Sequence, residues 1–120
     1  MVGAARPDPQ GSYHYGSIDI TRTLVLKNGV MFNGHEHRYT VNGVSFVHQD
    51  TPLKLADYFR LTDASYSSVI PDTPNDAAFP TFGTSVVEAV YRDFFHLVFQ
   101  NPRQYIQTWH LDGYNFFVVG

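Results

Sequence analysis

Residues 107–120, QTWHLDGYNFFVVG, place an imidazole, a carboxylate and a phenol at alternate positions. If this segment is an extended strand, His110, Asp112 and Tyr114 point to one side, because alternate side chains of a strand share a face. Imidazole, carboxylate and phenolate groups together can bind a transition metal. In the alternative interpretation these are ordinary polar residues of a strand, and Asp112 serves a turn at Gly113. The spacing alone leaves both interpretations open.

A second candidate metal site is the segment HEH at residues 35–37. The His-x-His spacing directs two imidazoles at one ion when the backbone is extended. This segment lies in a predicted connector, however, and no third ligand follows nearby in sequence. We therefore interpret it as a solvated polar turn. His14, His48 and His96 each stand alone and are expected at the surface or within strands.

Other catalytic classes find little support in the sequence. The chain has no cysteine, no Gly-x-Ser-x-Gly elbow and no glycine-rich loop that would bind phosphate. Glu36 and Glu88 are the only glutamates, and most aspartates occur in predicted turns, so a pair of catalytic carboxylates is not indicated. The aromatic pairs at 13/15 and 94/95 would suit stacking on sugar rings, although packing in the core is the favoured interpretation.

Composition restricts the class of partner. The 120 residues carry 8 Lys and Arg against 11 Asp and Glu, a net charge of −3, without a basic stripe that would neutralise phosphates. We therefore expect no nucleic-acid partner. No run approaches the roughly 18 apolar residues that span a bilayer, and the first residues lack the apolar core of a secretory signal. The aromatic content of 16% suits strands better than helices.

The hydrophobic pattern predicts strands along most of the chain. Alternation with a period of two favours strands at residues 17–26, 38–47, 84–92, 94–100, 105–111 and 115–119. Within one of these, the pair Asn42-Gly43 indicates either a tight hairpin or a kink in a single strand, and both stay open. Residues 27–37 contain two Asn-Gly pairs and are expected to form a turn or connector.

One helix is predicted. In Asp50-Thr51-Pro52 a capping residue precedes a proline, the order typical of a helix start, so we expect a short helix over Pro52–Phe59. Three prolines between Thr62 and Gly83 predict a long irregular loop. Together the elements predict a mostly β domain, a sandwich or a barrel, with one short helix.

Residues 109–114, WHLDGY, resemble the His-x-Trp-His-Leu-His-Gly-His copper motif in the last cupredoxin domain of multicopper oxidases. The segments ARPDPQGSYHYG and RYTVNGVSFVHQDTPLKLADYF are similar to the ascorbate-oxidase-related branch of plant proteins. That branch includes monocopper-oxidase-like, skewed-growth and pollen-specific proteins. The resemblance covers nearly the whole chain and implies an all-β fold, an incomplete cupredoxin-like (plastocyanin-like) Greek-key β-sandwich with one short helix.

The resemblance also implies a division of the chain. Residues 1–26 correspond to the tail of a middle cupredoxin domain, residues 27–37 to a connector, and residues 38–120 to the N-terminal part of a last cupredoxin domain. The chain is accordingly expected to be a fragment of a longer protein. The apolar run at residues 116–119 would then form an uncovered edge, which makes self-association through this terminal strand an expectation.

Position by position, the resemblance implies a degenerate copper motif. Gln107 stands where active members place a type-1 copper histidine, and Asp112 and Tyr114 stand where two further histidines belong. His110 keeps a ligand position of the trinuclear cluster and is the residual copper-ligand position. Type-1 copper also requires a cysteine thiolate, which this chain does not contain. Copper is the cofactor of the family, but we expect this chain to bind none and to be catalytically inactive.

The resemblance further implies an extracellular, secreted protein of the cell wall with a role in cell growth, including that of pollen tubes. Because no secretory signal is recognised, the localisation of this chain stays open. Two alternatives to an inactive member are retained. One is a fragment of a copper-dependent oxidoreductase that acts on ascorbate or phenols with oxygen. The other is a β-sandwich module that binds cell-wall polysaccharide or another partner through exposed aromatic side chains.

Overall fold

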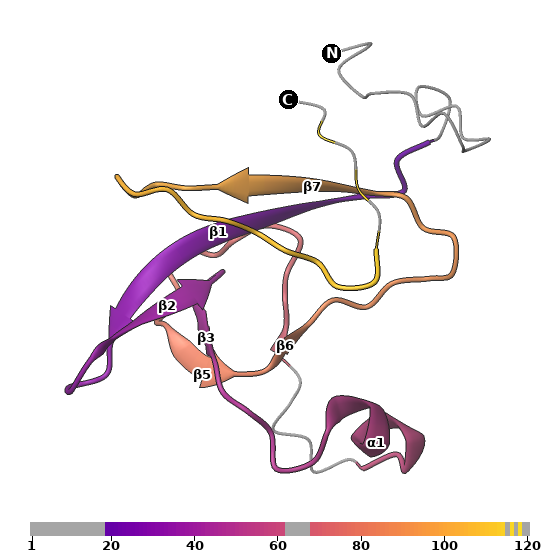
Figure 1. The fold of residues 1–120 in the computed structure, drawn as a ribbon, viewed down its shortest axis with the longest axis horizontal. Coiled ribbons are helices and arrows are strands. Elements are labelled where there is room, and N and C mark those ends of the chain that lie inside the picture. Colours follow the sequence, from indigo (N-terminus) through magenta and orange to yellow (C-terminus); the bar gives the residue numbers. More distant parts are fainter. Residues whose placement is uncertain (1–18, 62–67, 115, 117, 119–120) are drawn as a thin grey trace.

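The computed structural model describes residues 19–61, 68–114, 116 and 118 and shows strands with one short helix (Figure 1). A five-stranded sheet has the order β5-β3-β2-β1-β7, and β4 and β6 form a separate two-stranded sheet. The predicted mostly β architecture with a short helix is confirmed for the described residues. The elements are β1 (Arg22–Phe32), β2 (His37–Val41), β3 (Val44–Phe46), α1 (Leu53–Tyr58), β4 (Ser68–Val69), β5 (Thr81–Gly83), β6 (Ser85–Val86) and β7 (Phe95–Gln100).

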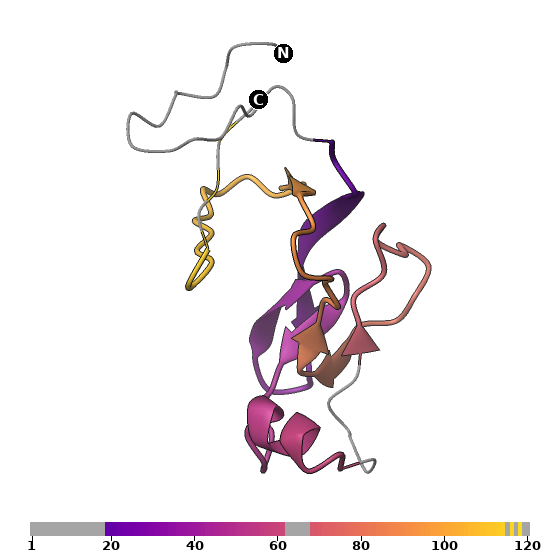
Figure 2. The ribbon, with the colours of Figure 1, turned by 90° about the vertical axis from the view of Figure 1, so that its right-hand side faces the viewer.

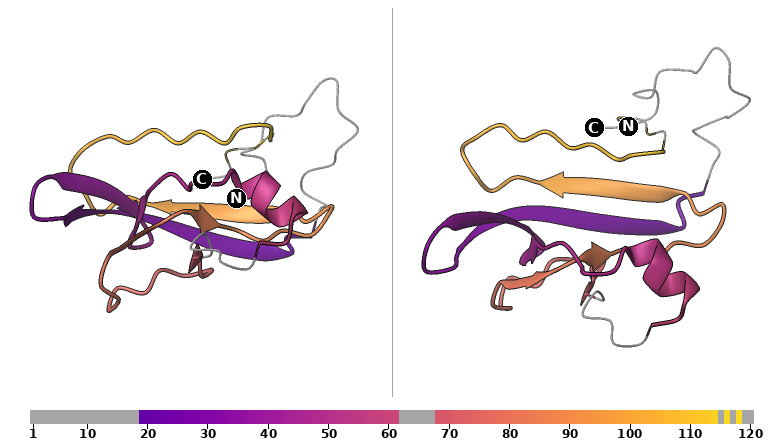
Figure 3. Two further views of the ribbon diagram at one scale, coloured as in Figure 1. Left: turned by 90° about the horizontal axis from the view of Figure 1, so that it is seen from below. Right: turned by 60° about the horizontal axis from the view of Figure 1, so that its bottom comes forward.

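Strand β1 has a different partner in each half. Residues 22–27 pair in parallel with β7, and residues 28–32 pair antiparallel with β2. The strand therefore joins the hairpin of β2 and β3 to β7, which lies beside its first half (Figures 1 and 3). Of the strand predicted over residues 17–26, the part from Arg22 onward is confirmed.

The predicted connector over residues 27–37 is wrong for residues 27–32, which continue β1. Gly29, in the first Asn-Gly pair, lies within the strand because it allows a close approach to β2. A Cβ at this position would lie 2.7 Å from Thr40 Oγ1. The turn falls instead at the second Asn-Gly pair, where Gly34 has φ +95°. The proposed division into domains stays a prediction.

Strands β2 and β3 form an antiparallel hairpin around the two-residue loop Asn42-Gly43. Both loop residues have positive φ, 49° and 83°, which is the requirement of a type I′ turn. Asn42 Oδ1 accepts a hydrogen bond from the Lys27 N–H at 2.7 Å, and Asn42 Nδ2 donates to the Val25 carbonyl at 2.9 Å. The hairpin interpretation is therefore confirmed, and the loop is tied to β1 where that strand changes partner.

The predicted helix is confirmed as α1, which lies at the end of the molecule away from β7 (Figures 1 and 2). Its start differs from the prediction: Pro52 is the N-cap rather than the first helical residue, and no side chain caps the helix. The Pro52 carbonyl accepts hydrogen bonds from the N–H groups of Leu55 and Ala56. Ala56 is fully buried and anchors the helix.

The predicted loop over residues 62–83 is wrong in part, because β4 and β5 lie within it; residues 62–67 lie outside the described residues. Strand β5 pairs in parallel with β3, an interaction between distant segments that local alternation does not reveal. The strand predicted over residues 84–92 is reduced to β6, two residues long. The strand predicted over residues 94–100 is confirmed as β7.

Few side chains of the described residues are fully buried. Leu24, Ala56 and Ile70 are the buried apolar residues, and Asn28, Thr40 and Ser45 are the buried polar ones. Large hydrophobic side chains remain exposed across the sheet and the C-terminal segment. No described helix has the length and apolarity required to cross a membrane.

Candidate functional site

The segment that follows β7 contains residues 107–114, which resemble a copper motif, and runs back along that strand (Figure 3). Its contact with β7 is a stack of aromatic rings: the centroids of Phe99 and Trp109 lie 4.6 Å apart with a tilt of 32°. Asn101 Nδ2 also donates to the Tyr105 carbonyl at 2.8 Å. The strand predicted over residues 105–111 is wrong, because the chain here packs through side chains without forming a ladder. Most of the strand predicted over residues 115–119 lies outside the described residues.

His110 and Asp112 contact each other at a turn. His110 Nε2 lies 2.7 Å from Asp112 Oδ1, and their side chains are 81% and 99% exposed. Gly113 follows with φ +77°, a left-handed conformation that reverses the chain. The strand on which His110, Asp112 and Tyr114 were predicted to share a face is therefore wrong, although the side chains of His110 and Asp112 contact each other. The alternative interpretation, in which Asp112 belongs to a turn at Gly113, is confirmed.

The donor groups of this segment do not match a blue-copper or trinuclear centre. Gln107 is half-buried and offers a neutral amide, while the Tyr114 phenol is 73% exposed. Across residues 19–61 and 68–114, no three His, Asp or Glu side chains converge as a metal site would require. His110 supplies one imidazole, and its Nε2 already contacts a carboxylate. The role of His110 as a residual copper ligand stays a prediction.

The second candidate site, HEH at residues 35–37, forms the turn between β1 and β2. Asn33 Oδ1 accepts hydrogen bonds from the N–H groups of His35 and Glu36, both at 2.9 Å. His37 is the first residue of β2, and its ring lies 5.1 Å from that of Phe32. The interpretation of this segment as a polar turn is therefore confirmed.

His48 and His96, the single histidines in the part of the chain that the structure describes, belong to no common metal site. His48 meets Phe46 edge to face at 4.9 Å, and His96 is half-buried in β7. The pair at 94/95 is also half-buried, and the ring of Phe95 lies 5.6 Å from the Arg22 guanidinium. His14 and the pair at 13/15 lie outside the described residues.

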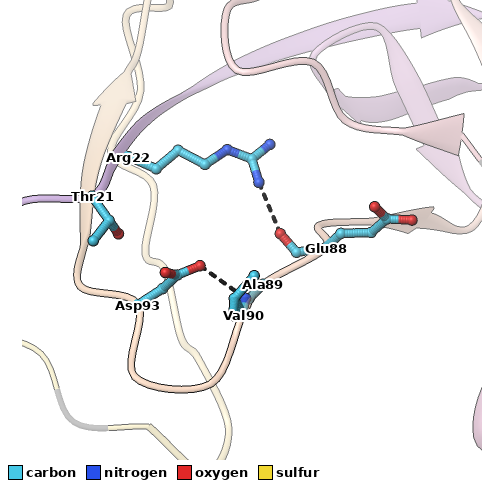
Figure 4. Close-up of a pocket in the computed structure, with 6 residues that line it drawn as sticks. All are labelled: Thr21, Arg22, Glu88, Ala89, Val90 and Asp93. Atoms are coloured by element: carbon cyan, nitrogen blue, oxygen red, sulfur yellow. Dashed lines mark hydrogen bonds between the residues drawn. The ribbon is translucent and has the colours of Figure 1, made fainter.

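Sequence reasoning missed a cluster around Arg22. The guanidinium binds the Asp72 carboxylate and donates from Nη1 to the Glu88 carbonyl at 2.8 Å (Figure 4). Asp93 Oδ2 accepts a hydrogen bond from the Val90 N–H in the same hollow. The hydrogen bond from Arg22 lowers the pKa of Asp72 below its ordinary value. Because Arg22 and Asp72 are 50 residues apart, no local pattern indicates the pair.

Comparison with known proteins places the chain in a family. The sequence model of the family described as multicopper oxidase matches residues 50–120. An L-ascorbate oxidase homolog of Nicotiana tabacum is 46% identical over 98% of this chain, and the monocopper oxidase-like proteins SKS2 and SKU5 of Arabidopsis thaliana are 44% and 42% identical over 98% and 99%. No solved structure matches.

This chain spans 22%, 20% and 20% of the length of those three relatives, about a fifth of each. The cupredoxin-like β-sandwich predicted from the resemblance is confirmed by the family match together with the strand-rich fold. The identities extend over nearly the whole chain, and the family model covers more than half of it. The chain therefore belongs to the multicopper oxidase family, in the group of L-ascorbate oxidase homologues and monocopper oxidase-like proteins.

Proposed function

We propose that this chain is a non-catalytic member of its family, in which the copper motif of the oxidases has become a structural turn. The proposal rests on the residues that occupy the histidine positions of the motif. Gln107, Asp112 and Tyr114 take the places that the resemblance assigns to histidines, and the remaining His110 contacts Asp112. An amide, a carboxylate and an exposed phenol do not supply the imidazole set of a copper oxidase.

The contact between His110 and Asp112 adds a second argument. His110 Nε2 lies 2.7 Å from Asp112 Oδ1. A metal binds to a ring nitrogen of an imidazole. Copper binding at Nε2 would therefore have to displace the contact with Asp112. Copper in the family accepts electrons from substrate and passes them to oxygen, and no step of that chemistry is assigned to this chain.

The biological role that we propose follows the resemblance: an extracellular protein that supports growth of the plant cell wall, including that of pollen tubes. The names of the relatives support membership of the oxidase-like group. The degenerate motif supports a role other than oxidation. An active copper oxidoreductase is the rival proposal, and the following experiment separates the two.

The test is a copper titration of the purified chain, followed by metal analysis after removal of free ions. We expect no stoichiometric copper and no oxidation of ascorbate or phenols above a free-copper control. The matched variant carries Gln107→His, Asp112→His and Tyr114→His, which restores three imidazoles, and it should retain more copper than the natural chain. Stoichiometric copper at sub-micromolar Kd that is lost in His110→Ala would overturn the proposal.

A second candidate function, binding of cell-wall polysaccharide, is supported by a row of exposed aromatic rings. Phe32, Tyr39 and Phe46 are 59%, 69% and 54% exposed. The register of β1, β2 and β3 places them on one face of the sheet. Val30, two residues before Phe32, pairs with Tyr39, and the pair Val41–Val44 sets Phe46 opposite Tyr39. Flat aromatic rings offer large apolar contact area to a sugar ring at low entropic cost.

This second function is tested by affinity electrophoresis in gels that contain pectin or a neutral wall polymer. Retardation by one polymer that disappears in Tyr39→Ala would support it. Phe79→Ala is the matched control, because Phe79 is 93% exposed and lies outside the row. Equal mobility in every gel would reject the proposal.

A further inference from the structure

The chain contains three Asn-Gly pairs, beginning at Asn28, Asn33 and Asn42. They differ in their exposure and in their hydrogen bonds. In such a pair the backbone nitrogen of glycine can attack the side-chain carbonyl carbon of asparagine, since glycine has no Cβ to obstruct the approach. The sequence alone makes the three pairs equivalent. Their surroundings decide which of them reacts.

Two of the pairs are protected. Asn28 is 5% exposed, and its residue pair lies inside the ladder of β1 and β2. Asn42 uses both ends of its carboxamide, because Oδ1 accepts from the Lys27 N–H and Nδ2 donates to the Val25 carbonyl. Rotation of this carboxamide toward Gly43 would break both hydrogen bonds at a half-buried position. The fold therefore opposes reaction at Asn28 and Asn42.

Asn33 has the opposite surroundings. It is exposed in the turn between β1 and β2, and Gly34 is also exposed, with no atom within 4 Å of a built Cβ. Asn33 Oδ1 accepts two backbone hydrogen bonds at 2.9 Å, from the N–H groups of His35 and Glu36. Among the described residues no acceptor is assigned to Asn33 Nδ2 or to the Gly34 N–H.

The N–H groups of His35 and Glu36, which donate to Asn33 Oδ1, have a chemical consequence. When a nucleophile adds to the carboxamide carbon, negative charge develops on Oδ1, and donors aimed at that atom stabilise the charge as an oxyanion hole does. The same turn therefore exposes the nucleophile, polarises the electrophile and leaves the departing nitrogen without a bond to the fold. All three conditions meet at Asn33. At Asn42 a backbone N–H also binds Oδ1, but Nδ2 is held by the Val25 carbonyl, and Asn28 is buried.

We propose that Asn33 is a site of spontaneous deamidation in the folded protein. The Gly34 nitrogen loses its proton to hydroxide and bonds to Asn33 Cγ, the Cγ–Nδ2 bond breaks, and the departing NH2 group takes one proton from water and leaves as ammonia, which regenerates the hydroxide. Water then opens the resulting succinimide at either carbonyl carbon and yields aspartate or isoaspartate. Asparagine and water are thus converted to an acid and ammonia, with no oxidant or enzyme required.

The product changes the turn in two ways. It adds a negative charge close to Glu36, and the isoaspartate form adds a backbone atom to a connection whose hydrogen bonds depend on the length of the Asn33 side chain. The β1–β2 connection is therefore a position where the protein changes with age. This inference is independent of the proposed loss of oxidase activity.

The experiment incubates the full chain at pH 8 and 37 °C, with and without 8 M urea, and follows each pair by peptide mass mapping and isoaspartate labelling. In buffer, Asn33 should react at least about tenfold faster than Asn28 and Asn42, because the fold must open locally before those two can react. In urea the three rates should converge. Similar rates for the three pairs in buffer would overturn the proposal, as would a slower rate at Asn33.

Two variants serve as controls. His35→Pro removes one of the two N–H donors and keeps the Asn-Gly pair, so deamidation at Asn33 should slow in buffer and stay unchanged in urea. Asn33→Gln should remove the fast acidic product on isoelectric focusing. An unchanged rate in folded His35→Pro would show that the backbone donors do not promote the reaction.

Discussion

The hairpin of β2 and β3 and the segment after β7 are both rich in strand-forming residues, yet only the first forms strands. The hairpin closes on a loop whose Asn42 binds β1 through two side-chain hydrogen bonds. The segment after β7 is held by an aromatic stack between Phe99 and Trp109 and by a side-chain hydrogen bond from Asn28 of β1 to Asn101, at its start. The difference shows that a segment with alternating apolar residues forms a strand only when a neighbouring strand shares backbone hydrogen bonds with it. Side-chain packing alone leaves such a segment irregular.

The largest effect in this comparison is expected at Asn42. Asn42→Ala removes both side-chain hydrogen bonds to β1 and places at φ 49° a residue that tolerates the left-handed conformation less well than asparagine. Two lost partners and the left-handed strain should lower the free energy of unfolding by about 2–4 kcal/mol, measured by urea unfolding. Asn42→Asp keeps the acceptor and tolerates this conformation, so its loss should be smaller. Equal stability of Asn42→Ala and the natural chain would contradict the role of this residue.

Next in size is the close approach of β1 to β2 at Gly29. Gly29→Ala would place its Cβ 2.7 Å from Thr40 Oγ1, a contact too short to keep without a shift of one strand. We expect a loss of about 1–3 kcal/mol in the free energy of unfolding. The double variant Gly29→Ala/Thr40→Ala removes the obstructing oxygen and should recover part of the loss. If the double variant lost as much free energy of unfolding as the two single variants together, this explanation would be refuted.

A smaller effect is expected in the segment after β7. Trp109→Ala removes the stack on Phe99, and because the tryptophan is 37% exposed, only part of its surface is withdrawn from water on folding. The free energy of unfolding should fall by about 1 kcal/mol, less than for Asn42→Ala. Trp109→Phe keeps a ring and is the matched control. If Trp109→Ala lowered the free energy of unfolding more than Asn42→Ala does, the segment after β7 would contribute more to stability than the hairpin, contrary to this prediction.

The sequence predicted the elements whose partners are close in the chain. Asn42-Gly43 predicts the hairpin because type I′ turns need two residues that tolerate positive φ, and the proline at residue 52 marks the helix within one position. The same reasoning failed at Gly29, where a glycine that looks like a turn residue instead permits two strands to approach. Local pattern does not distinguish these two uses of glycine.

The copper motif shows the same limit. Types and spacing left the nature of residues 107–114 open, and the origin of this segment in a copper motif, which the resemblance implies, stays a prediction. The expected shared face of His110 and Tyr114 required an extended strand, whereas the chain turns at Gly113. The Arg22–Asp72 pair had no sequence signal at all, because Asp72 lies in the connection between β4 and β5, which is held against β1 by a hydrogen bond from the Val25 N–H to the Asp72 carbonyl.

The smallest predicted effect concerns this ion pair. The hydrogen bond from Arg22 lowers the pKa of Asp72 in the folded protein, so the pair stabilises the fold above the ordinary carboxyl pKa of 3.8. This contribution is lost as the pH falls through the lowered folded value. Asp72 is 46% exposed, which keeps the effect small and sensitive to salt.

The measurement compares the free energy of unfolding of the natural chain and of Asp72→Asn between pH 6 and pH 2.5. Acidification below about pH 4 should destabilise the natural chain more steeply than the variant, since only the natural chain must protonate a bound carboxylate. Raising the salt concentration should narrow the difference between the two curves. Parallel curves at low salt would show that Asp72 is equally easy to protonate in the folded and unfolded chains. The contact with Arg22 would then hold these segments in place without a net electrostatic contribution.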